Sequence, residues 1–564
     1  MSLNTLFRPS PVAASADTGD EEKKPKRPAL SRTLTVIAAI IVFIALVVPD
    51  TLGRPRAGAF LPGAFLRIPM EGIIGAALLI VVPGRARRML AVLLGGGLGI
   101  LVILKMVNMG FRAVLARRFD PVLDLPLFGN GYDYLHETFG RAAAIGIVIA
   151  TIALVIAAIT IAALAVLRLA NATARYEKPA TRTVTALIAA WVAFALLGTQ
   201  LYPGAPVAST STIGLAKDTA VGVPKSLHDH EAFTAEARND AFKDTPPGQL
   251  LTGLRGRDVV ISVVESYGRS ALENPSLAKL IEPSLSLGAQ QLTAAGFAAR
   301  SGWLTSSTFG GGSWLAHASF QSGLWINNQG RYRQLVAGNR MTLTGAFQRA
   351  GWETVAVEPG NHRAWPEAKF YGYDQVYDAR NLGYQGPRFG WSSMPDQYTL
   401  ATFQRDVYAR SHAPMMAELT LTSSHSPWTV TPQMVDWNAV GDGTIFAPMA
   451  ERSQDRSSLW QKSSQVRTAY AQSIAYTMES LTSWAATYGD ENLVLVFFGD
   501  HQPVTTVAGA NASHDVPITI VAKDPAVLDR IAGWGWQDGL KPGPKAPVWK
   551  MDEFRDKFLT AFGA

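Results

Sequence analysis

Five apolar stretches within the first 201 residues constrain the fold of this chain more than any other feature. They cover residues 33–48, 68–82, 89–111, 142–167 and 184–201. Several approach the roughly 20 apolar residues that a helix needs to cross a bilayer. The sequence therefore predicts a transmembrane domain of about five helices over residues 33–202, and the apolar share of 48% for the whole chain agrees with it.

The placement of Lys and Arg predicts how these helices are oriented. With the N-terminus in the cytoplasm, 13 of these residues lie in the predicted cytoplasmic segments and 7 in the loops 50–67 and 109–141, as the positive-inside rule requires. Residues 1–32 are polar and rich in Pro and charge, which predicts a disordered cytoplasmic tail. We interpret the first apolar stretch as a retained anchor. Five spans then place all residues after Tyr202 outside the plasma or inner membrane.

Composition excludes several kinds of chemistry. The net charge of +7 does not indicate a nucleic-acid binder, because the basic residues lie in the tail and the short loops and not on one face. The chain has no cysteine, so disulfides, thiolate metal sites and cysteine nucleophiles are excluded. Any chemistry must use oxygen and nitrogen groups.

Two segments outside the spans have their own patterns. Apolar residues at helical spacing stand beside three arginines and predict an amphipathic helix near residues 111–120 on the outer leaflet. Residues 203–255 show no sustained periodicity and predict a juxtamembrane linker. Glu71 and Lys105 are expected at the outer ends of the second and third spans, either as an ion pair or as two residues that reach water separately.

The pattern changes from Asp258 onward. Short β-branched apolar runs at 258–264, 354–357, 415–421, 492–498 and 516–521 alternate with helical or loop stretches. Alternating strands and helices predict an α/β domain with a largely parallel central sheet over residues 256–564.

Polar residues follow four of the predicted strands directly. Glu265, Glu358, His425 and the pair Asp500-His501 all stand at or just beyond strand ends. Ligands of open α/β sheets bind beyond the carboxyl ends of the strands, so these residues predict one site. Glu265, Asp500 and His501 offer two carboxylates and an imidazole, a set that suits one divalent cation, Mn²⁺, Mg²⁺ or Zn²⁺.

A glycine run forms the second chemical centre. Gly310-Gly311-Gly312 enters a helical stretch that begins at Ser313. Glycines there let a ligand oxygen approach backbone N–H groups at the helix N-terminus, which is an anion site. Ser313 is predicted as the N-cap and, beside a metal, as an activated nucleophile; the alternative is that it only caps the helix.

The order of these motifs resembles the alkaline phosphatase superfamily. The order is Glu265, then Gly-Gly-Gly-Ser313 with Ser322-Gly323 nine and ten residues later, then His425 with Pro427, then Gly499-Asp500-His501. Within the superfamily, the chain looks most similar to the membrane-bound lipoteichoic acid synthases, phosphoglycerol transferases and phosphoethanolamine transferases. Membrane helices followed by an outside catalytic domain are also similar to that branch.

The resemblance implies roles for individual residues. Glu265, Asp500 and His501 would be the metal ligands, with Mn²⁺ preferred, and Ser313 the nucleophile that also contacts the metal. His425 would bind the substrate phosphate or assist the leaving group, with His317 as the alternative. The remaining residues would contact substrate: Trp365, Arg363 as a phosphate clamp, His362 and His514.

Three departures from the family pattern leave alternatives open. Many of these transferases use Thr, so Thr308 is the second candidate nucleophile. The spacing from His514 to Val516-Pro517 is off by one, which leaves its role open. Sulfatases need Pro and Arg at the second and fourth positions after the modified residue; Leu315 and His317 stand there, which disfavours a sulfatase.

The function that the resemblance implies is a membrane-anchored phosphotransferase. It would move a phosphoglycerol or phosphoethanolamine group from a phospholipid donor to a cell-envelope glycan or glycolipid through a phosphoserine-type intermediate. The alternatives are a phosphatase or phosphodiesterase of the same superfamily and a non-catalytic envelope protein. The last is disfavoured because none of the expected ligands is missing.

Overall fold

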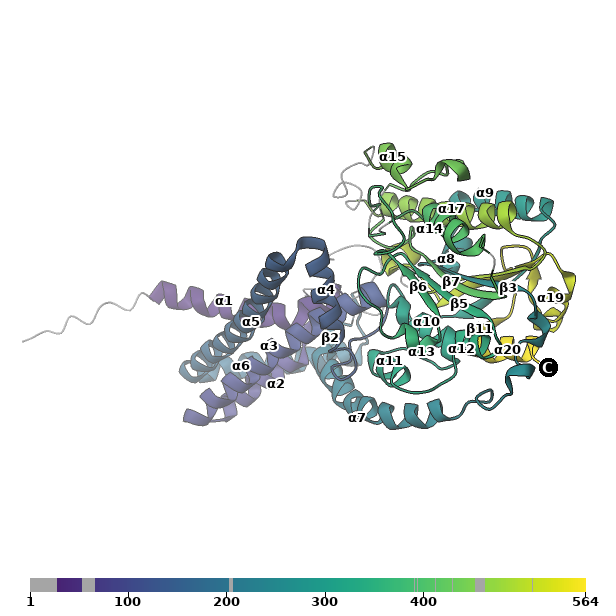
Figure 1. Ribbon diagram of the computed structural model, residues 1–564. Helices are drawn as coiled ribbons and strands as arrows, with labels where there is room; N and C mark the ends of the chain where they lie inside the picture. Colours follow the sequence, from purple (N-terminus) through teal and green to yellow (C-terminus); the bar gives the residue numbers. More distant parts are fainter. Residues whose placement is uncertain are drawn as a thin grey trace, which may run out of the picture.

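The computed structural model shows a bundle of helices followed by an α/β domain (Figure 1). It describes residues 28–52, 66–201, 206–389, 391–392, 394–410, 412–428, 430–451, 462–509 and 511–564. Residues 1–27 of the predicted tail lie outside the described residues. The two parts confirm the predicted class of fold.

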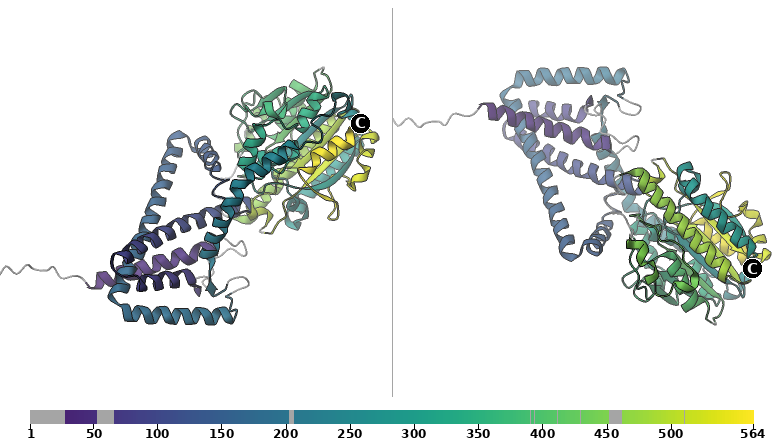
Figure 2. Two further views of the ribbon diagram at one scale, coloured as in Figure 1. Left: turned by 90° about the horizontal axis from the view of Figure 1, so that it is seen from below. Right: turned by 90° about the horizontal axis from the view of Figure 1, so that it is seen from above.

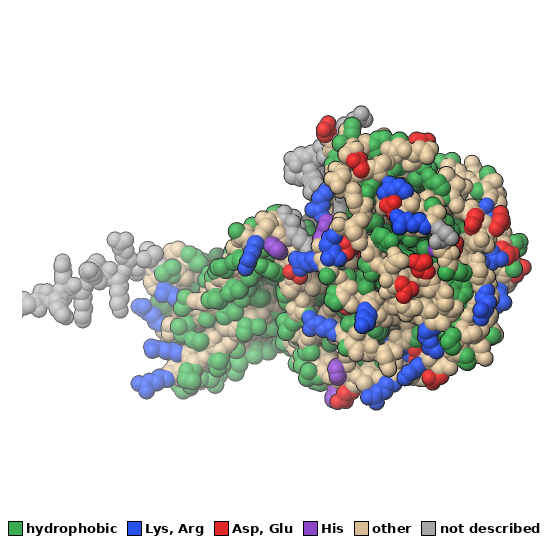
Figure 3. Space-filling view, viewed as in Figure 1, with side chains coloured by type: hydrophobic (Ala, Val, Ile, Leu, Met, Phe, Trp, Pro, Cys, Tyr) green, Lys and Arg blue, Asp and Glu red, His purple; other side chains and the backbone are tan. Residues whose placement is uncertain are grey.

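Each of the five apolar stretches lies largely in one helix. These helices are α1 (Pro28–Leu52), α2 (Met70–Val81), α3 (Gly84–Leu115), α5 (Arg141–Arg175) and α6 (Glu177–Leu196). Helices α3, α5 and α6 are long and apolar enough to cross a membrane, while α2 and the apolar part of α1 are shorter. Apolar side chains cover the bundle, and Lys and Arg gather at its end away from the α/β domain (Figure 3). The number of spans and their orientation stay predictions.

Helices α3 and α5 cross at two glycines one turn apart. A Cβ on Gly95 would lie 2.6 Å from Ala163 Cα, and a Cβ on Gly99 would lie 2.7 Å from Ile159 Cα. No side chain fits in such gaps, so glycine lets the two backbones touch. Small residues four apart are the usual way in which helices without a hydrophobic driving force pack closely.

Gly99→Ala should therefore destabilise the protein, while Gly97→Ala on the open side of the same helix should not. The added methyl at residue 99 meets backbone, which forces the helices apart and costs about 1–3 kcal/mol. Residue 97 has no atom within 4 Å of a built Cβ, and alanine has the better helix propensity. Thermal unfolding of the detergent-purified chain measures both. Equal midpoints for the two variants would contradict this packing.

The amphipathic helix expected at 111–120 is not a separate element. Residues 111–115 are the C-terminal end of α3, and Ala116 ends the helix in the left-handed region with φ +51°. The chain then turns around Asp124, which accepts two hydrogen bonds of 2.7 Å from the Arg117 guanidinium. The helix of this region is α4 (Leu127–Phe139). The prediction was wrong because the apolar residues that suggested an interfacial face lie on both sides of this turn.

The predicted linker joins the two parts, but it is not irregular: helix α7 (Ser211–Arg238) makes up about half of it. Gly214, Gly222 and Pro224 disfavour a helix, so the residue pattern did not predict one. Contacts with the bundle hold its N-terminus. Glu71 Oε1 accepts hydrogen bonds from the backbone N–H groups of Thr212 and Ile213 at 2.8 and 2.9 Å. Lys105 Nζ donates to Thr212 Oγ1 at 2.8 Å.

The other end of α7 is fixed by buried charges. Asp240, just beyond the helix, accepts from Arg555 Nη2 at 2.8 Å and lies 3.4 Å from Arg340 Nε. All three side chains are buried. Removing the charge of one member of such a group leaves the others uncompensated, which costs about 3–5 kcal/mol. Helix α7 is therefore attached at both ends.

The central sheet of the α/β domain has the order β10-β4-β9-β8-β3-β7-β5-β6, with β11 beside β4. Strands β8 (Leu493–Gly499), β3 (Asp258–Val264), β7 (Met415–Leu421), β5 (Glu353–Glu358) and β6 (Gln375–Asp378) are parallel, as predicted. Strand β9 (Asp515–Ala522) runs antiparallel to β8 and to β4 (Ala298–Thr305), so the whole sheet is mixed. The sequence predicted five of these strands and missed β4, β6, β10 (Gln537–Asp538) and β11 (Val548–Lys550).

Helices cover both faces of the sheet (Figure 1). One face packs on α9 (Pro275–Ala294), α14 (Asp396–Phe403) and α17 (Ser463–Tyr488), and the other on α10 (Ser313–Ser322), α12 (Leu343–Arg349) and α20 (Glu553–Phe562). Strands buried on both sides read as continuous apolar runs, which is why the central ones were found from sequence. Figure 2 shows the same layers from two other directions.

The remaining elements are short. They are α8 (Arg269–Glu273), α11 (Gln329–Val336), α13 (Ala368–Tyr371), α15 (Ala447–Glu451), α18 (Thr505–Ala508) and α19 (Pro525–Asp529), together with the two-residue strands β1 (Ile68–Pro69) and β2 (Ala208–Ser209).

Candidate active site

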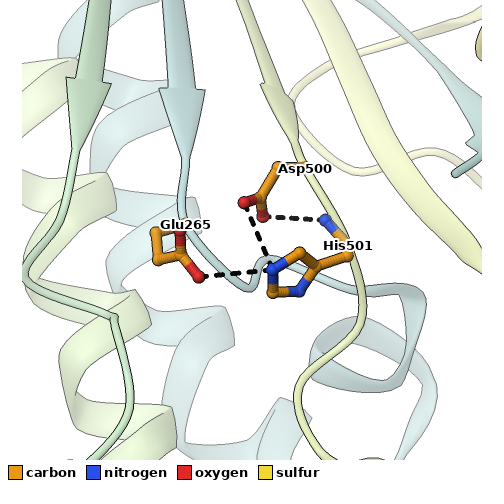
Figure 4. Close-up of side chains that lie close together, drawn as sticks. All are labelled: Glu265, Asp500 and His501. Atoms are coloured by element: carbon orange, nitrogen blue, oxygen red, sulfur yellow. Dashed lines mark hydrogen bonds and ion pairs between the residues drawn. The ribbon is translucent and has the colours of Figure 1, made fainter. Parts of the chain in front are cut away.

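Two neighbouring parallel strands bring Glu265 and Asp500 together. Val264 at the end of β3 pairs with Gly499 at the end of β8, so the next residue of each strand leaves the sheet at the same level. His501 follows Asp500 and turns back toward both carboxylates (Figure 4). A Cβ on Gly499 would lie 1.9 Å from the carbonyl oxygen of Tyr267, so only glycine permits this close approach. The predicted ligand set is thus assembled by strand register.

The three side chains form a compact, buried group. His501 Nε2 lies 3.5 Å from Glu265 Oε1 and 3.4 Å from Asp500 Oδ2. The other ring nitrogen, Nδ1, donates to the carbonyl oxygen of Gln502 at 2.8 Å, which leaves Nε2 free to bind a cation. Asp500 Oδ1 accepts from the N–H groups of Ser266 and His501 at 2.7 Å each. Asp500 Oδ2 is buried and has no hydrogen-bond partner in the described part of the chain.

The electrostatics of this group fit a bound cation. Burial, with the neighbouring charge of Glu265, raises the pKa of Asp500 to about 6. Burial lowers the pKa of His501, but the negative charges of Asp500 and Glu265 outweigh it, and the pKa is raised overall. A carboxylate oxygen without a partner in such a place is costly unless a positive charge compensates it. Two carboxylates and one imidazole form a donor set for Mn²⁺, Mg²⁺ or Zn²⁺.

Ser313 lies directly beside this group. Its Oγ donates to Glu265 Oε2 at 3.0 Å and lies 3.2 Å from His501 Nε2. Ser313 is the first residue of α10, and the N-cap is Gly312, so the expectation that the serine caps the helix was wrong. The φ angles of Gly310, Gly311 and Gly312 are +68°, +153° and +83°, which only glycine adopts readily. The glycines thus direct the serine side chain toward the carboxylates.

The other candidate nucleophile does not reach the group. Thr308 Oγ1 is buried and has no hydrogen-bond partner within the residues that the structure describes. Its backbone N–H is held by Ser306 Oγ at 3.2 Å. Of the two predicted nucleophiles, the structure brings only Ser313 to Glu265 and His501.

Two of the predicted histidines lie close enough to interact electrostatically with Asp500 and His501. The ring of His425 stacks on Trp391 with ring centres 3.9 Å apart, and its Nδ1 donates to the carbonyl oxygen of Ser426. His317 lies one helical turn after Ser313. Burial lowers the pKa of both histidines to about 4, so both are neutral at neutral pH.

The remaining predicted substrate residues lie further out. His514 packs against Phe309 before the glycine run, and burial lowers its pKa. Trp365 is half-buried beside Tyr371 and Tyr373. His362 and Arg363 are exposed; the first contacts Arg388, and the second lies 3.3 Å from Asp133 of α4. No contact joins these four residues to Glu265, Asp500 or His501 among the described residues.

Three residues near the site were not found by sequence reasoning. Ser266 donates to Glu265 Oε1 at 2.9 Å, and Trp391 supports His425. Glu418 lies within the buried strand β7, beside His317. A charged residue inside an otherwise apolar run was a signal for Glu418, whereas nothing in the sequence distinguished Trp391.

The end of helix α3 packs on the glycine run. A Cβ on Gly310 would lie 1.8 Å from the carbonyl oxygen of Val114, and Leu115 lies 3.7 Å from a Cβ built on Gly311. Thr505 Oγ1 donates to the carbonyl oxygen of Ala113 at 2.6 Å. The loop that carries Ser313 is therefore in direct contact with a candidate membrane span.

Comparisons with known proteins identify the class of this domain. Residues 257–517 match the sulfatase family model. The chain therefore carries a sulfatase-family domain over these residues, which confirms the predicted resemblance at the level of this domain. A search of curated proteins found no match.

Several solved structures are similar to this chain at low identity. The lipoteichoic acid synthase LtaP from Listeria monocytogenes is 14% identical, with 58% of this chain and 76% of that chain covered and a TM-score of 0.35. The C-terminal periplasmic domain of EcEptC from Escherichia coli is 13% identical, with 58% and 84% covered and a TM-score of 0.37. The phosphoglycerol transferase GacH from Streptococcus pyogenes is 12% identical, with 59% and 89% covered and a TM-score of 0.33. Because these values are low, the family assignment depends on the sulfatase family model.

Gly310→Ala should lower turnover strongly while metal binding persists. The added methyl meets the Val114 carbonyl, so either α3 or the loop that carries Ser313 must move. A misplacement of about 1 Å at a nucleophile costs on the order of 100-fold in rate. Gly539→Ala is the matched control, since its φ of +98° is also positive but no atom lies near a built Cβ. Equal activity of the two variants would contradict a role for the contact with α3.

Proposed function

We propose that this protein is a metal-dependent phosphotransferase that takes a phospho-alcohol group from a membrane phospholipid. One observation carries the proposal: Ser313 Oγ, at the start of a helix behind a glycine run, lies within 3.2 Å of two members of a buried carboxylate and histidine group. A hydroxyl beside a metal-binding set and backbone N–H groups is the arrangement that nucleophilic phosphoryl transfer needs.

Glu265, Asp500 and His501 would hold one divalent cation, with Mn²⁺ preferred. When bound, the cation supplies positive charge that favours the ionised serine and polarises a phosphoryl oxygen. The remaining chemistry belongs to the chain. Ser313 Oγ forms the new bond to phosphorus while the bond to diacylglycerol breaks, and the serine proton ends on the departing alcohol. In the second displacement the proton of the acceptor hydroxyl returns to Ser313.

His425 is suited to move these protons. Its Nδ1–H is engaged by Ser426, so the free Nε2 is a proton acceptor, and its low pKa keeps it neutral. We assign it the transfer of the proton between serine, leaving alcohol and incoming hydroxyl. The backbone N–H groups at the start of α10 would hold the phosphoryl oxygens. Trp365, Arg363, His362 and His514 remain candidates for contacts with the outer part of the substrate.

A lipid donor is supported by the position of the glycine run. The loop before Ser313 packs on the last turn of α3, a helix long and apolar enough to span a membrane. A phospholipid headgroup would thus be close to the nucleophile. Lys and Arg gather at the opposite end of the bundle, which favours a cytoplasmic position for that end and an extracytoplasmic catalytic domain (Figure 3). The acceptor would then be a glycan or glycolipid of the cell envelope.

A hydrolase of the same superfamily is the second candidate function. A phosphatase or phosphodiesterase would share Ser313 and the metal ligands and would use water in the second displacement. A specific feature favours this candidate as well: Ser313 is only half-buried, so water can reach its hydroxyl. A sulfatase is disfavoured, since Leu315 and His317 replace the Pro and Arg that formylglycine formation requires.

The decisive experiment measures release of diacylglycerol from labelled phosphatidylglycerol and phosphatidylethanolamine by the purified full chain. We expect release with Mn²⁺, none after chelation, and a loss of at least about 1,000-fold in Ser313→Ala, as for other covalent nucleophiles. Thr308→Val is the matched control and should keep most of the activity. Mass spectrometry of the trapped intermediate should find the added group on Ser313.

Two results would overturn the proposal. Full activity of Ser313→Ala would exclude Ser313 as the nucleophile. If the metal-loaded protein releases diacylglycerol from neither lipid, a phospholipid donor is excluded. Adding a glycolipid acceptor separates the two candidate functions. A transferase forms a labelled glycolipid, whereas a hydrolase releases free glycerol phosphate or phosphoethanolamine at the same rate with or without the acceptor.

A further inference from the structure

A second group of metal-binding side chains lies beside the catalytic group and is separate from it. It consists of His317 on α10, Glu358 at the end of β5 and Glu418 within β7. One ligand atom from each lies within 4.8 Å of the others. His317 Nδ1 is 3.8 Å from Glu418 Oε1, too far for a hydrogen bond but suitable for two ligands of one ion. The group sits one strand further along the sheet, since β7 is the neighbour of β3.

The protein orients each carboxylate through only one of its oxygens. Glu418 Oε2 accepts hydrogen bonds from Tyr373 Oη at 2.7 Å and from Gln321 Nε2. Glu358 Oε1 accepts from Thr420 Oγ1 at 2.8 Å. The second oxygen of Glu418 faces His317. Ligating carboxylates are typically held in this way by outer hydrogen bonds while the other oxygen binds the metal.

Helix α10 connects the two groups. Ser313, His317 and Gln321 stand at intervals of four residues, so they lie along one face of the helix. The first contacts the catalytic carboxylate Glu265, the second faces Glu418, and the third donates to Glu418. A helix that begins at the nucleophile is therefore fixed through its next two turns to this second group.

The two carboxylates have hydrogen bonds but no Lys or Arg ion-pair partner in the described part of the chain. Glu358 and Glu418 do not hydrogen-bond to each other as an acid pair sharing a proton would. Burial raises the pKa of Glu358, aided by the charge of Glu418, to about 8, and burial raises that of Glu418 to about 7. His317 Nε2 is also buried without a hydrogen-bond partner. Without a cation these carboxyl groups are therefore driven toward the neutral form, and a bound cation would favour the ionised form.

We propose that His317, Glu358 and Glu418 form a second divalent-cation site, which takes a first-row ion such as Mn²⁺ or Zn²⁺. One imidazole and two carboxylates suit these ions and disfavour softer ones. The ion would hold α10 against β5 and β7 and so position Ser313, while Glu265, Asp500 and His501 hold the other ion. The proposal concerns metal content and does not depend on the identity of the substrate.

The test counts Mn²⁺ bound by the purified full chain, with electron paramagnetic resonance of free Mn²⁺ during titration and elemental analysis of the loaded protein. We expect two ions per chain in the wild type and one in Asp500→Asn. We expect one in Glu418→Gln, one in Glu358→Gln, and none in Asp500→Asn combined with Glu418→Gln. Glu353→Gln, at the opposite end of β5, is the matched control and should keep two ions.

Two variants at the proposed site guard against a folding defect. Glu418 belongs to a buried network, so Glu358→Gln provides an independent reading if Glu418→Gln does not give a folded protein by circular dichroism. One ion in the wild type would overturn the proposal, as would two ions in both folded variants. Because the readout needs no lipid, absence of diacylglycerol release would contradict the proposed function and leave this result unaffected.

Discussion

The pairing register of β3 and β8 brings the candidate metal ligands of this protein together. Because Val264 pairs with Gly499, Glu265 and Asp500 leave the sheet side by side, in a place that water does not reach. Two buried acids repel each other, and the raised pKa of Asp500 shows how poorly the protein alone stabilises the charged form. The arrangement makes physical sense when a cation is bound, since the ion turns a repulsive pair into two ligands. The sheet therefore builds a site with the donor set and the electrostatics that suit a divalent cation.

The glycine run connects that site to the helical bundle. Its backbone passes between the end of α3 and Glu265, and a single Cβ at residue 310 would collide with the α3 backbone. The same three glycines give the positive φ angles that direct Ser313 inward. The segment thus meets two separate demands, close packing and unusual backbone geometry, and glycine is the one residue type that satisfies both. A shift of α3 would act directly on the loop that carries Ser313, because no other element lies between them.

The parts that could be predicted from sequence are those in which local pattern and final environment agree. Strands buried on both faces are continuous apolar runs, so β3, β7 and β8 and the polar residues beyond them were found, and with them Glu265, Asp500 and His501. Helix α7 was missed because its glycines and Pro224 oppose a helix that contacts with the rest of the fold hold in place, among them those of Glu71, Lys105 and Asp240. Residues 111–120 were misassigned because apolar spacing does not reveal the left-handed turn at Ala116. The second metal group was not predicted, since its members come from three elements and meet only in the folded domain.

Helix α7 also limits how the α/β domain can move relative to the helical bundle. At 1.5 Å per residue its 28 residues extend over at most about 42 Å, with one end bound to α2 and α3 and the other to α20. A flexible tether of that many residues would let the domain sweep a broad volume and reach distant partners. A helix held at both ends by hydrogen bonds and buried charges instead restricts the position and orientation of the domain relative to the bundle. The length of this helix therefore sets how far the α/β domain can reach from the bundle, and any partner of the site must come within that reach.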